Sequence, residues 1–218
     1  MHTNQADRWV ADYQFVRGIN FLAPMALCYE TSGGRFIGTM SHLGEGNPLW
    51  DSFPSFADHC AVVSVAVRES APIADVAVYY PIEAAWLGGE ALAAAARSLR
   101  DVCVALDERQ IGYDLIDAHA LADARVSAGV LETPGQLYGA VIVPATPAMP
   151  VAALAALADF RDGGGRVGFC ADLPAMPAEL DAGDAFAAAR GRLLAGAVEM
   201  DATHARSEMG DDDARGLG

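Results

Sequence analysis

The chain has 218 residues, 53% hydrophobic and 20% charged, so it can bury at least one core and is too short for more than two domains. Its 29 acidic residues outnumber 14 basic ones, and the net charge of −15 excludes the basic surface that nucleic acid requires. The apolar runs are shorter than the roughly 20 residues that cross a bilayer, and the N-terminus lacks the apolar core of a signal peptide. The sequence therefore predicts a cytoplasmic protein with no nucleic-acid partner and no membrane partner.

The first 55 residues are richer in aromatic residues, Gly and Pro, and poorer in Ala, than the rest of the chain. Their pattern predicts a helix at the start, a strand at 18–22 and a long irregular stretch at 32–54. Such a segment cannot bury a core by itself. We interpret residues 1–55 as the end of a truncated domain, followed by a connecting helix within residues 56–71.

From residue 72 onward, short runs rich in Val, Ile and Tyr alternate with Ala-rich runs. This alternation is typical of βαβ units with a parallel sheet. The predicted strands are 75–80, 113–116, 140–144 and 166–170, and the predicted helices are 89–109, 118–124, 150–161 and 181–194. Right-handed crossovers between such strands predict a doubly wound, flavodoxin-like α/β domain over residues 72–200. The remaining residues, 201–218, read as a solvated acidic tail.

The four cysteines, Cys28, Cys60, Cys103 and Cys170, are widely spaced and favour buried thiols over a zinc site. We therefore expect no metal and no cofactor from the residue pattern itself. Cys170 also has a catalytic interpretation, because it ends a predicted strand, where class I amidotransferases keep a thiolate nucleophile. Against this, Asp172 occupies the place where a nucleophile elbow needs Gly, and no His-x-Glu pair follows in the chain.

Several motifs occur in a recognisable order along the chain. They are RGIN at 17–20, NPLW at 47–50, ADVAVYYPIEAAW at 74–86, YDLIDAHAL at 113–121, the stretch 138–144 and FRDGGGRV at 160–167. Their order and spacing resemble the large bacterial α-L-rhamnosidases. In that family a (β/α)8 barrel precedes a class I amidotransferase-like domain, which is similar to the trimerisation domain of β-galactosidases. The resemblance implies that residues 1–55 are the last strands and loops of the barrel and that residues 72–200 are the following domain.

Glycoside hydrolysis needs two carboxylates across the scissile bond. The resemblance implies that both come from barrel strands preceding Met1, so the catalytic residues remain unknown in this chain. One departure from the family pattern is that Met25 follows Pro24, where relatives tend to carry His.

Barrel active sites lie at the carboxyl ends of strands, so Asn20 is a candidate for binding a sugar hydroxyl. Tyr29 and Glu30 could join it, and Trp50 could stack on a pyranose ring. The resemblance also allows a calcium ion at Glu30. The structural alternatives are a turn or cap for Asn20 and loop packing for Trp50.

Glu83 follows the strand at 75–80, and we expect either a loop contact to a neighbouring barrel or a carboxylate at a helix N-terminus. Three functional hypotheses remain. The first is a C-terminal fragment of a glycoside hydrolase acting on rhamnose-containing glycans, which lacks its own catalytic carboxylates. The second is a non-catalytic structural or oligomerisation module, with a homo-oligomer or an upstream barrel as partner. A third is a free-standing amidotransferase-like hydrolase that uses Cys170.

Overall fold

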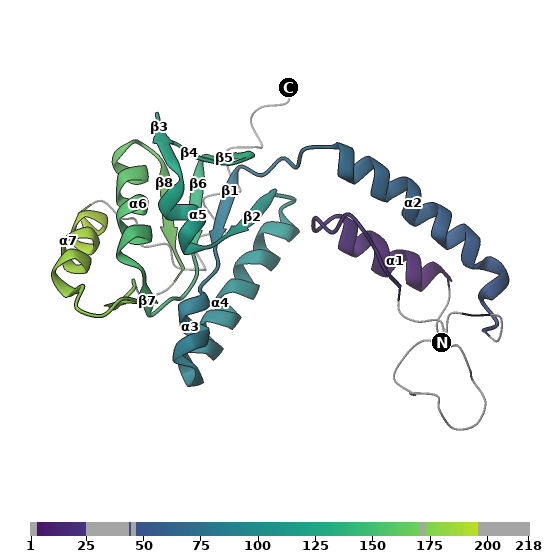
Figure 1. Cartoon of the computed structure of the whole chain (residues 1–218), viewed down its shortest axis with the longest axis horizontal. Coiled ribbons are helices and arrows are strands. Elements are labelled where there is room, and N and C mark those ends of the chain that lie inside the picture. The colour runs from purple at the N-terminus through teal and green to yellow at the C-terminus, as the bar shows by residue number, and fades with distance from the viewer. Residues whose placement is uncertain (1–3, 25–43, 45–46, 171–172, 196–218) are drawn as a thin grey trace. The chain divides into compact units, whose positions relative to one another are not determined.

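The computed structural model describes residues 4–24, 44, 47–170 and 173–195, and every structural statement below concerns these residues. Met25, Cys28, Tyr29, Glu30 and the tail 201–218 lie outside the described part. The chain divides into two compact units, Met1–Pro72 and Ile73–Gly218 (Figure 1). In the described residues, no helix is long and apolar enough to cross a membrane.

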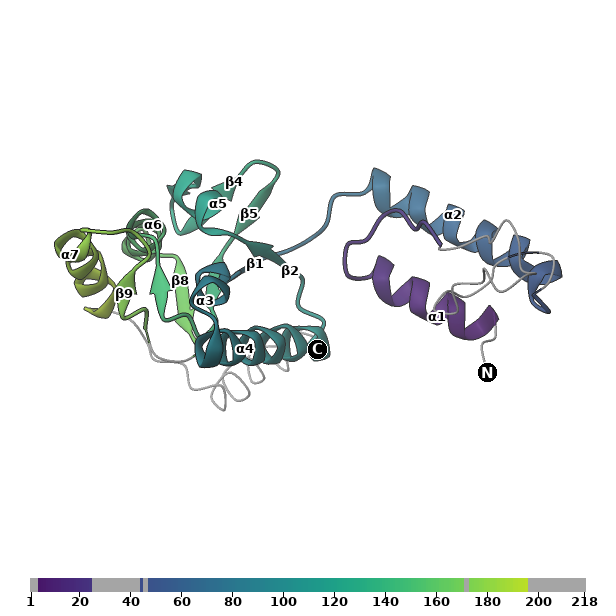
Figure 2. The same cartoon turned by 60° about the horizontal axis from the view of Figure 1, so that its bottom comes forward.

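The first unit pairs two helices, α1 (Asn4–Phe15) and α2 (Phe53–Glu69), the second preceded by the short 3-10 helix η1 (Trp50–Ser52). The two helices lie side by side in both ribbon views (Figures 1 and 2). His59 Nε2 of α2 lies 2.6 Å from Asp12 Oδ1 of α1. Ala11 and Phe15 are the buried apolar residues of this unit, and none of the α2 residues is buried.

The predicted strand at 18–22 is wrong, because this stretch has no regular structure. A strand requires a neighbour to pair its backbone groups, and no strand is described in this unit. Gly18 instead turns the chain with φ +90°, a conformation that glycine adopts without strain. The carbonyl oxygen of Asn20 then accepts a hydrogen bond from the Ser64 hydroxyl, so the segment returns along α2.

The second unit is built on a four-stranded parallel sheet, as the βα alternation predicts. Its strands are β1 (Val76–Tyr79), β2 (Tyr113–Ile116), β6 (Ala140–Val143) and β8 (Arg166–Phe169). They are ordered β2-β1-β6-β8, and every neighbouring pair is parallel. All four residues of β1 are buried, as expected for a central strand covered on both faces.

Helices cover both faces of this sheet. They are α3 (Ile82–Leu87), α4 (Gly89–Glu108), α5 (Ala118–Asp123), α6 (Val151–Asp162) and α7 (Gly183–Leu194). On one face α4 packs Leu106 against Val76 and Val78. On the other face α5 and α6 cover the sheet, and α7 packs against α6 (Figure 2). The sequence predicted the ranges of all of these helices except α3, for which it offered only a helix start at Glu83 as one of two interpretations.

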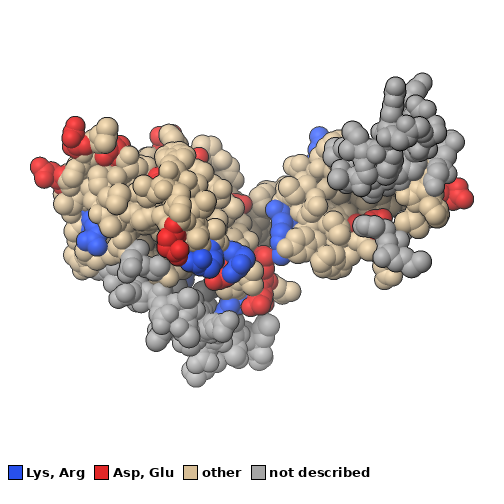
Figure 3. All heavy atoms as spheres, turned by 90° about the horizontal axis from the view of Figure 1, so that it is seen from below, with Lys and Arg blue, Asp and Glu red and all other residues tan. Residues whose placement is uncertain are grey.

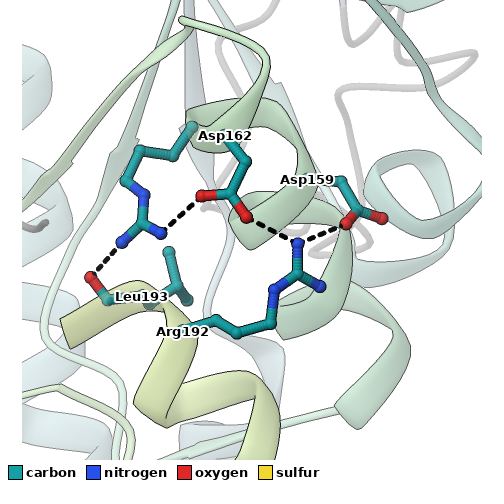
Figure 4. Close-up of polar contacts among 5 residues, drawn as sticks. Asp159, Asp162, Arg192 and Leu193 are labelled. Carbon is teal, nitrogen blue, oxygen red and sulfur yellow. Dashed lines mark hydrogen bonds and ion pairs between the residues drawn. The ribbon is translucent and has the colours of Figure 1, made fainter. Parts of the chain in front are cut away.

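A clamp of charged groups joins the carboxyl ends of α6 and α7 (Figure 4). Arg192 Nη2 lies 2.8 Å from Asp159 Oδ1 and 2.7 Å from Asp162 Oδ2. Arg161 donates to the carbonyl oxygen of Leu193 and also pairs with Asp162. The hydrogen bonds from Arg161 and Arg192 lower the pKa of the Asp162 carboxyl. These ion pairs are mostly exposed and add little stability, so burial of apolar side chains such as Leu193 is the main force holding α7.

Two small sheets were not predicted from the sequence. The antiparallel sheet contains β3 (Arg125–Ser127), β4 (Val130–Thr133) and β5 (Gln136–Tyr138), and the second contains β7 (Ala148–Met149) paired in parallel with β9 (Met176–Pro177). The first hairpin turns at Ala128 and Gly129, both with positive φ, as the tight turns that match strand twist require. The Tyr138 hydroxyl donates to Asp114 Oδ2 at 3.0 Å and so ties β5 to β2.

Candidate functional site

The carboxyl edge of the parallel sheet is the part of this fold where open α/β sheets bind ligands. Four connections leave the sheet there, beginning with Tyr80 after β1, Asp117 after β2, Pro144 after β6 and Cys170 after β8. Backbone N–H groups tie several of these connections to neighbouring elements. The Ala145 N–H, for example, donates to the Ser98 hydroxyl of α4 at 2.9 Å, which fixes the connection after β6.

Glu83 is the most deeply buried charged residue in the described part of this edge. It lies in the first turn of α3, and only 3% of its surface is exposed. The hydroxyl of Tyr79, which is fully buried at the end of β1, donates to Glu83 Oε2 at 2.9 Å. Pro81 separates the strand from the helix and allows the chain to turn, which brings the two side chains together. Of the two interpretations of Glu83, the position in the first turn of a helix is confirmed, whereas a contact to a barrel stays a prediction.

The electrostatics of Glu83 disfavour its ionised form. Burial raises the pKa of its carboxyl, and the negative charges of Asp117 and Glu179 raise it further, although its own backbone and the Tyr79 hydroxyl act in the opposite direction. Burial and the Glu83 carboxyl together raise the pKa of the Tyr79 hydroxyl. A buried acid with a raised pKa at the edge of a sheet is a recognised feature of active sites, but structural pairs also produce it.

The other two carboxylates at this edge have structural partners. Asp117 Oδ1 accepts from the backbone N–H of Ala120 at 2.8 Å, which makes Asp117 the N-cap of α5. Both carboxylate oxygens of Glu179 lie 3.2 Å from the backbone N–H of Val151, the first residue of α6. Glu179 therefore caps the start of α6 from 28 residues away, in place of a cap from Pro150.

A shallow hollow of about 410 Å³ lies at the ends of β1 and β2. Its lining consists of Tyr80, Leu115, Ile116, Asp117 and Ala120. The backbone N–H of Tyr80 donates to the carbonyl oxygen of Ile116 at 2.8 Å, which holds the two connections together. Tyr80 is 42% exposed and Leu115 is 51% exposed, so an aromatic and an aliphatic side chain face solvent here beside a carboxylate.

Cys170 does not have the surroundings of a nucleophile. Burial raises the pKa of its thiol to about 11, so at neutral pH only about one thiol in ten thousand is ionised. No hydrogen bond or neighbouring charge in the described residues opposes this rise. The arrangement favours the buried-thiol interpretation over the catalytic one.

The predicted sugar-binding residues are only partly described. Asn20 is exposed, and its backbone carbonyl oxygen contacts Ser64. Trp50 begins η1 and stacks on Phe53 with ring centroids 5.7 Å apart, an arrangement that matches loop packing. Tyr29 and Glu30 lie outside the described residues, so a calcium ion at Glu30 also stays a prediction. A role in sugar binding stays a prediction for all four residues.

Metal binding gives no further candidate in the described residues, and neither does the charge on the face that Figure 3 shows. No group of three or more His, Cys, Asp and Glu side chains is placed to hold a metal ion there. In Figure 3, uncharged residues cover most of the visible face of the described residues, acidic and basic side chains lie beside one another in its lower central part, and further acidic side chains are scattered at its upper left. The hollow and the buried Tyr79–Glu83 pair are therefore the features that distinguish the carboxyl edge.

Sequence reasoning missed Tyr79, Tyr80, Asp117 and Glu179. Asp117 carried a local signal, because an Asp directly before a helical run is a typical N-cap. Glu179 carried none, since its partner at Val151 is remote in sequence.

Comparison with known proteins gives one structural similarity at low sequence identity. A rhamnosidase from Novosphingobium sp. PP1Y matches with a TM-score of 0.53 and 18% identity, over 88% of this chain and 17% of that chain. No protein-family model matches the chain, and neither does any curated protein. The unit Ile73–Gly218 makes up about two thirds of the chain, so a match over 88% includes part of Met1–Pro72 as well. The chain has a rhamnosidase-like α/β fold that spans 17% of the length of that enzyme.

Proposed function

We propose that the chain is the C-terminal fragment of a glycoside hydrolase that acts on rhamnose-containing glycans. In this proposal residues 1–55 complete a (β/α)8 barrel, residues 72–200 form an amidotransferase-like domain, and the catalytic carboxylates lie elsewhere. The observation that carries the proposal is that the structural similarity to a rhamnosidase extends over parts of both units.

The surface of the first unit supports the proposal. Large apolar side chains are exposed on and beside both of its helices, namely Trp9, Val10 and Tyr13 on α1, Val16 directly after α1, and Val62 and Val65 on α2. Val16 alone is 79% exposed. Exposed apolar surface on this scale is typical of an interface, and a helix pair that buries so few side chains needs a larger body to pack against. The rest of a barrel would supply that body.

The strand order supports the amidotransferase-like part. Renumbered along the chain, the parallel strands run 2-1-3-4, which is the beginning of the 2-1-3-4-5 order of flavodoxin-like sheets. Class I amidotransferases have a doubly wound sheet of this kind.

The described carboxylates at the edge of the sheet support the placement of catalysis elsewhere. A glycosidase acid and its partner must both face the scissile bond. Glu83 is buried against Tyr79, and Asp117 and Glu179 each cap a helix. Asp117 and Glu179 therefore have structural tasks that a catalytic role would disturb, and Glu83, only 3% exposed, is closed off from a substrate.

Hydrolysis of an aryl α-L-rhamnoside tests the proposal. Two proteins are compared, the 218-residue chain by itself and the chain extended by whatever sequence is encoded in frame before Met1. We expect turnover only by the extended protein, and we expect a Glu83→Gln variant of that protein to retain it. Turnover by the chain alone, abolished by Glu83→Gln or Glu30→Gln, would overturn the placement of the catalytic carboxylates.

A second candidate is a non-catalytic structural or oligomerisation module. The exposed apolar residues of α1 and α2 favour it as well, because a second copy of the chain can also cover them. Sedimentation of the 218-residue chain and of a Val16→Ser, Val62→Ser variant distinguishes the two. A stable homo-oligomer that the variant loses, together with no rhamnosidase activity in the extended protein, would favour the module.

A further inference from the structure

The hollow at the ends of β1 and β2 has no part in the proposed barrel chemistry, and its lining has a specific composition. It combines an exposed aromatic ring, Tyr80, with an exposed carboxylate, Asp117, over an apolar floor of Leu115, Ile116 and Ala120. Its volume of about 410 Å³ falls within the range of small-ligand sites. Among the described residues, no Arg and no His lines it.

Asp117 is held in place with one oxygen available. Its Oδ1 accepts from the Ala120 N–H at 2.8 Å, and this bond fixes the side chain at the start of α5. Within the described residues, no donor is bonded to Oδ2. A ligand that donates a hydrogen bond to Oδ2 therefore meets an acceptor that is already oriented, and little side-chain entropy is lost on binding.

The charges around the hollow decide which ligands fit. Asp117 and Glu179 place negative charge at this edge, and among the described residues no basic side chain lines the hollow to pair with a phosphate or a carboxylate. An organic cation would be attracted, but its pairing with an exposed carboxylate in an open hollow is screened by water and contributes little. A neutral ring with hydroxyl groups uses both features, because its C–H face packs on an aromatic ring while a hydroxyl donates to the carboxylate.

We propose that the hollow lined by Tyr80, Leu115 and Asp117 binds one neutral sugar ring, as a secondary glycan-binding site on the α/β unit. The choice of a sugar over an organic cation rests partly on the proposed function. The site lies on a different unit from residues 1–55, and it needs neither a catalytic carboxylate nor a metal. Its role is to hold a glycan by a sugar residue that lies away from the bond to be cleaved.

Binding is measured on the 218-residue chain by amide chemical-shift changes on titration with methyl α-L-rhamnopyranoside, methyl α-D-glucopyranoside and butylammonium. We expect saturable shifts at Tyr80, Leu115, Asp117 and Ala120 with at least one glycoside. Sugar concentrations of ~0.1 M give high occupancy even when Kd is about 10 mM. Because this assay needs no turnover, its failure leaves the glycosidase proposal to its own test.

Variants identify the groups that bind. Tyr80→Ala should weaken sugar binding by roughly tenfold, since it removes the ring, whereas Tyr80→Phe should retain it. Asp117→Asn keeps the N-cap and can still hydrogen-bond a hydroxyl, so sugar binding should fall only a few-fold. The matched control is Trp86→Ala, which removes a 73% exposed aromatic side chain of α3 that does not line the hollow, and binding should be unchanged.

Three outcomes would overturn the proposal. The first is that no glycoside produces saturable shifts at these residues. The second is that Tyr80→Ala binds as tightly as the unmodified chain. The third is that butylammonium binds, that Asp117→Asn abolishes its binding and that the glycosides do not bind, which would assign the hollow to an organic cation instead.

Discussion

Replacement of Glu83 by Gln isolates the energetic cost of the buried carboxylate charge while keeping an acceptor for Tyr79. Gln has nearly the same shape and retains an acceptor for the Tyr79 hydroxyl, which donates to Glu83 at 2.9 Å. It removes the charge that burial and the carboxylates of Asp117 and Glu179 disfavour. We therefore expect Glu83→Gln to stabilise the chain at neutral and alkaline pH.

The sign follows from proton linkage. The pKa of Glu83 is higher in the folded chain than in the unfolded chain, so over the interval between these two values the folded state binds more protons. The contribution of Glu83 to the free energy of unfolding therefore falls as the pH rises from the unfolded pKa, near 4.5, through the folded pKa, and is constant above it. Each pKa unit between the two states is worth about 1.4 kcal/mol. Below the interval, the variant and the unmodified chain should have similar stability.

Urea unfolding followed by circular dichroism at about pH 3.5, below the unfolded pKa, and at about pH 8 measures this difference. We expect Glu83→Gln to gain stability over the unmodified chain at the higher pH, on the order of 1 kcal/mol. The control is Glu132→Gln, an exposed carboxylate on β4, whose effect should stay within about 0.5 kcal/mol at both pH values. If Glu83→Gln lowered stability at the higher pH, or if its effect were the same at both, Glu83 would be ionised and stabilised by a group not described above.

Three further predictions concern other parts of the α/β unit. Gly112→Ala should destabilise this unit by more than about 1 kcal/mol, because a Cβ would overlap the backbone carbonyl of Ile73. Gly191→Ala, on the open side of α7, should stabilise the unit by up to about 1 kcal/mol. Thermal unfolding compares the two variants, and equal effects would contradict the packing described for Gly112. Arg192→Gln removes the ion pairs with Asp159 and Asp162, so it should speed hydrogen exchange of the α7 amides at low salt, where these pairs are least screened. An exchange rate that depends on neither salt nor the substitution would show that the ion pairs do not stabilise α7. Iodoacetamide should modify Cys170 slowly at neutral pH, with a rate that rises about tenfold per pH unit up to a pKa of about 11; fast modification at pH 7 would restore the catalytic interpretation.

Much of the second unit could be predicted from the sequence, because its elements follow from local patterns. The strand at 113–116 has the predicted bounds, and β1, β6 and β8 differ from their predicted ranges by one residue at one or both ends. These strands are short apolar runs between Ala-rich helices, a pattern set by neighbouring residues. The same is true of the end of α6, where Gly164 takes the left-handed conformation expected of that Gly-rich turn, with φ +94°.

The candidate site depends on contacts that no local pattern contains. Tyr79 and Glu83 meet because a strand ends, turns at Pro81 and enters a short helix that sequence periodicity does not reveal. Glu179 reaches Val151 across 28 residues, and the hollow forms only where the ends of β1 and β2 lie side by side. The prediction of a strand at 18–22 was wrong for the same reason, because a strand forms only when a partner elsewhere in the chain pairs with it. Local propensity and periodicity thus determined the elements of this protein. Burial, charge and pairing between distant residues, which only the tertiary structure decides, determined the chemistry of its sheet edge.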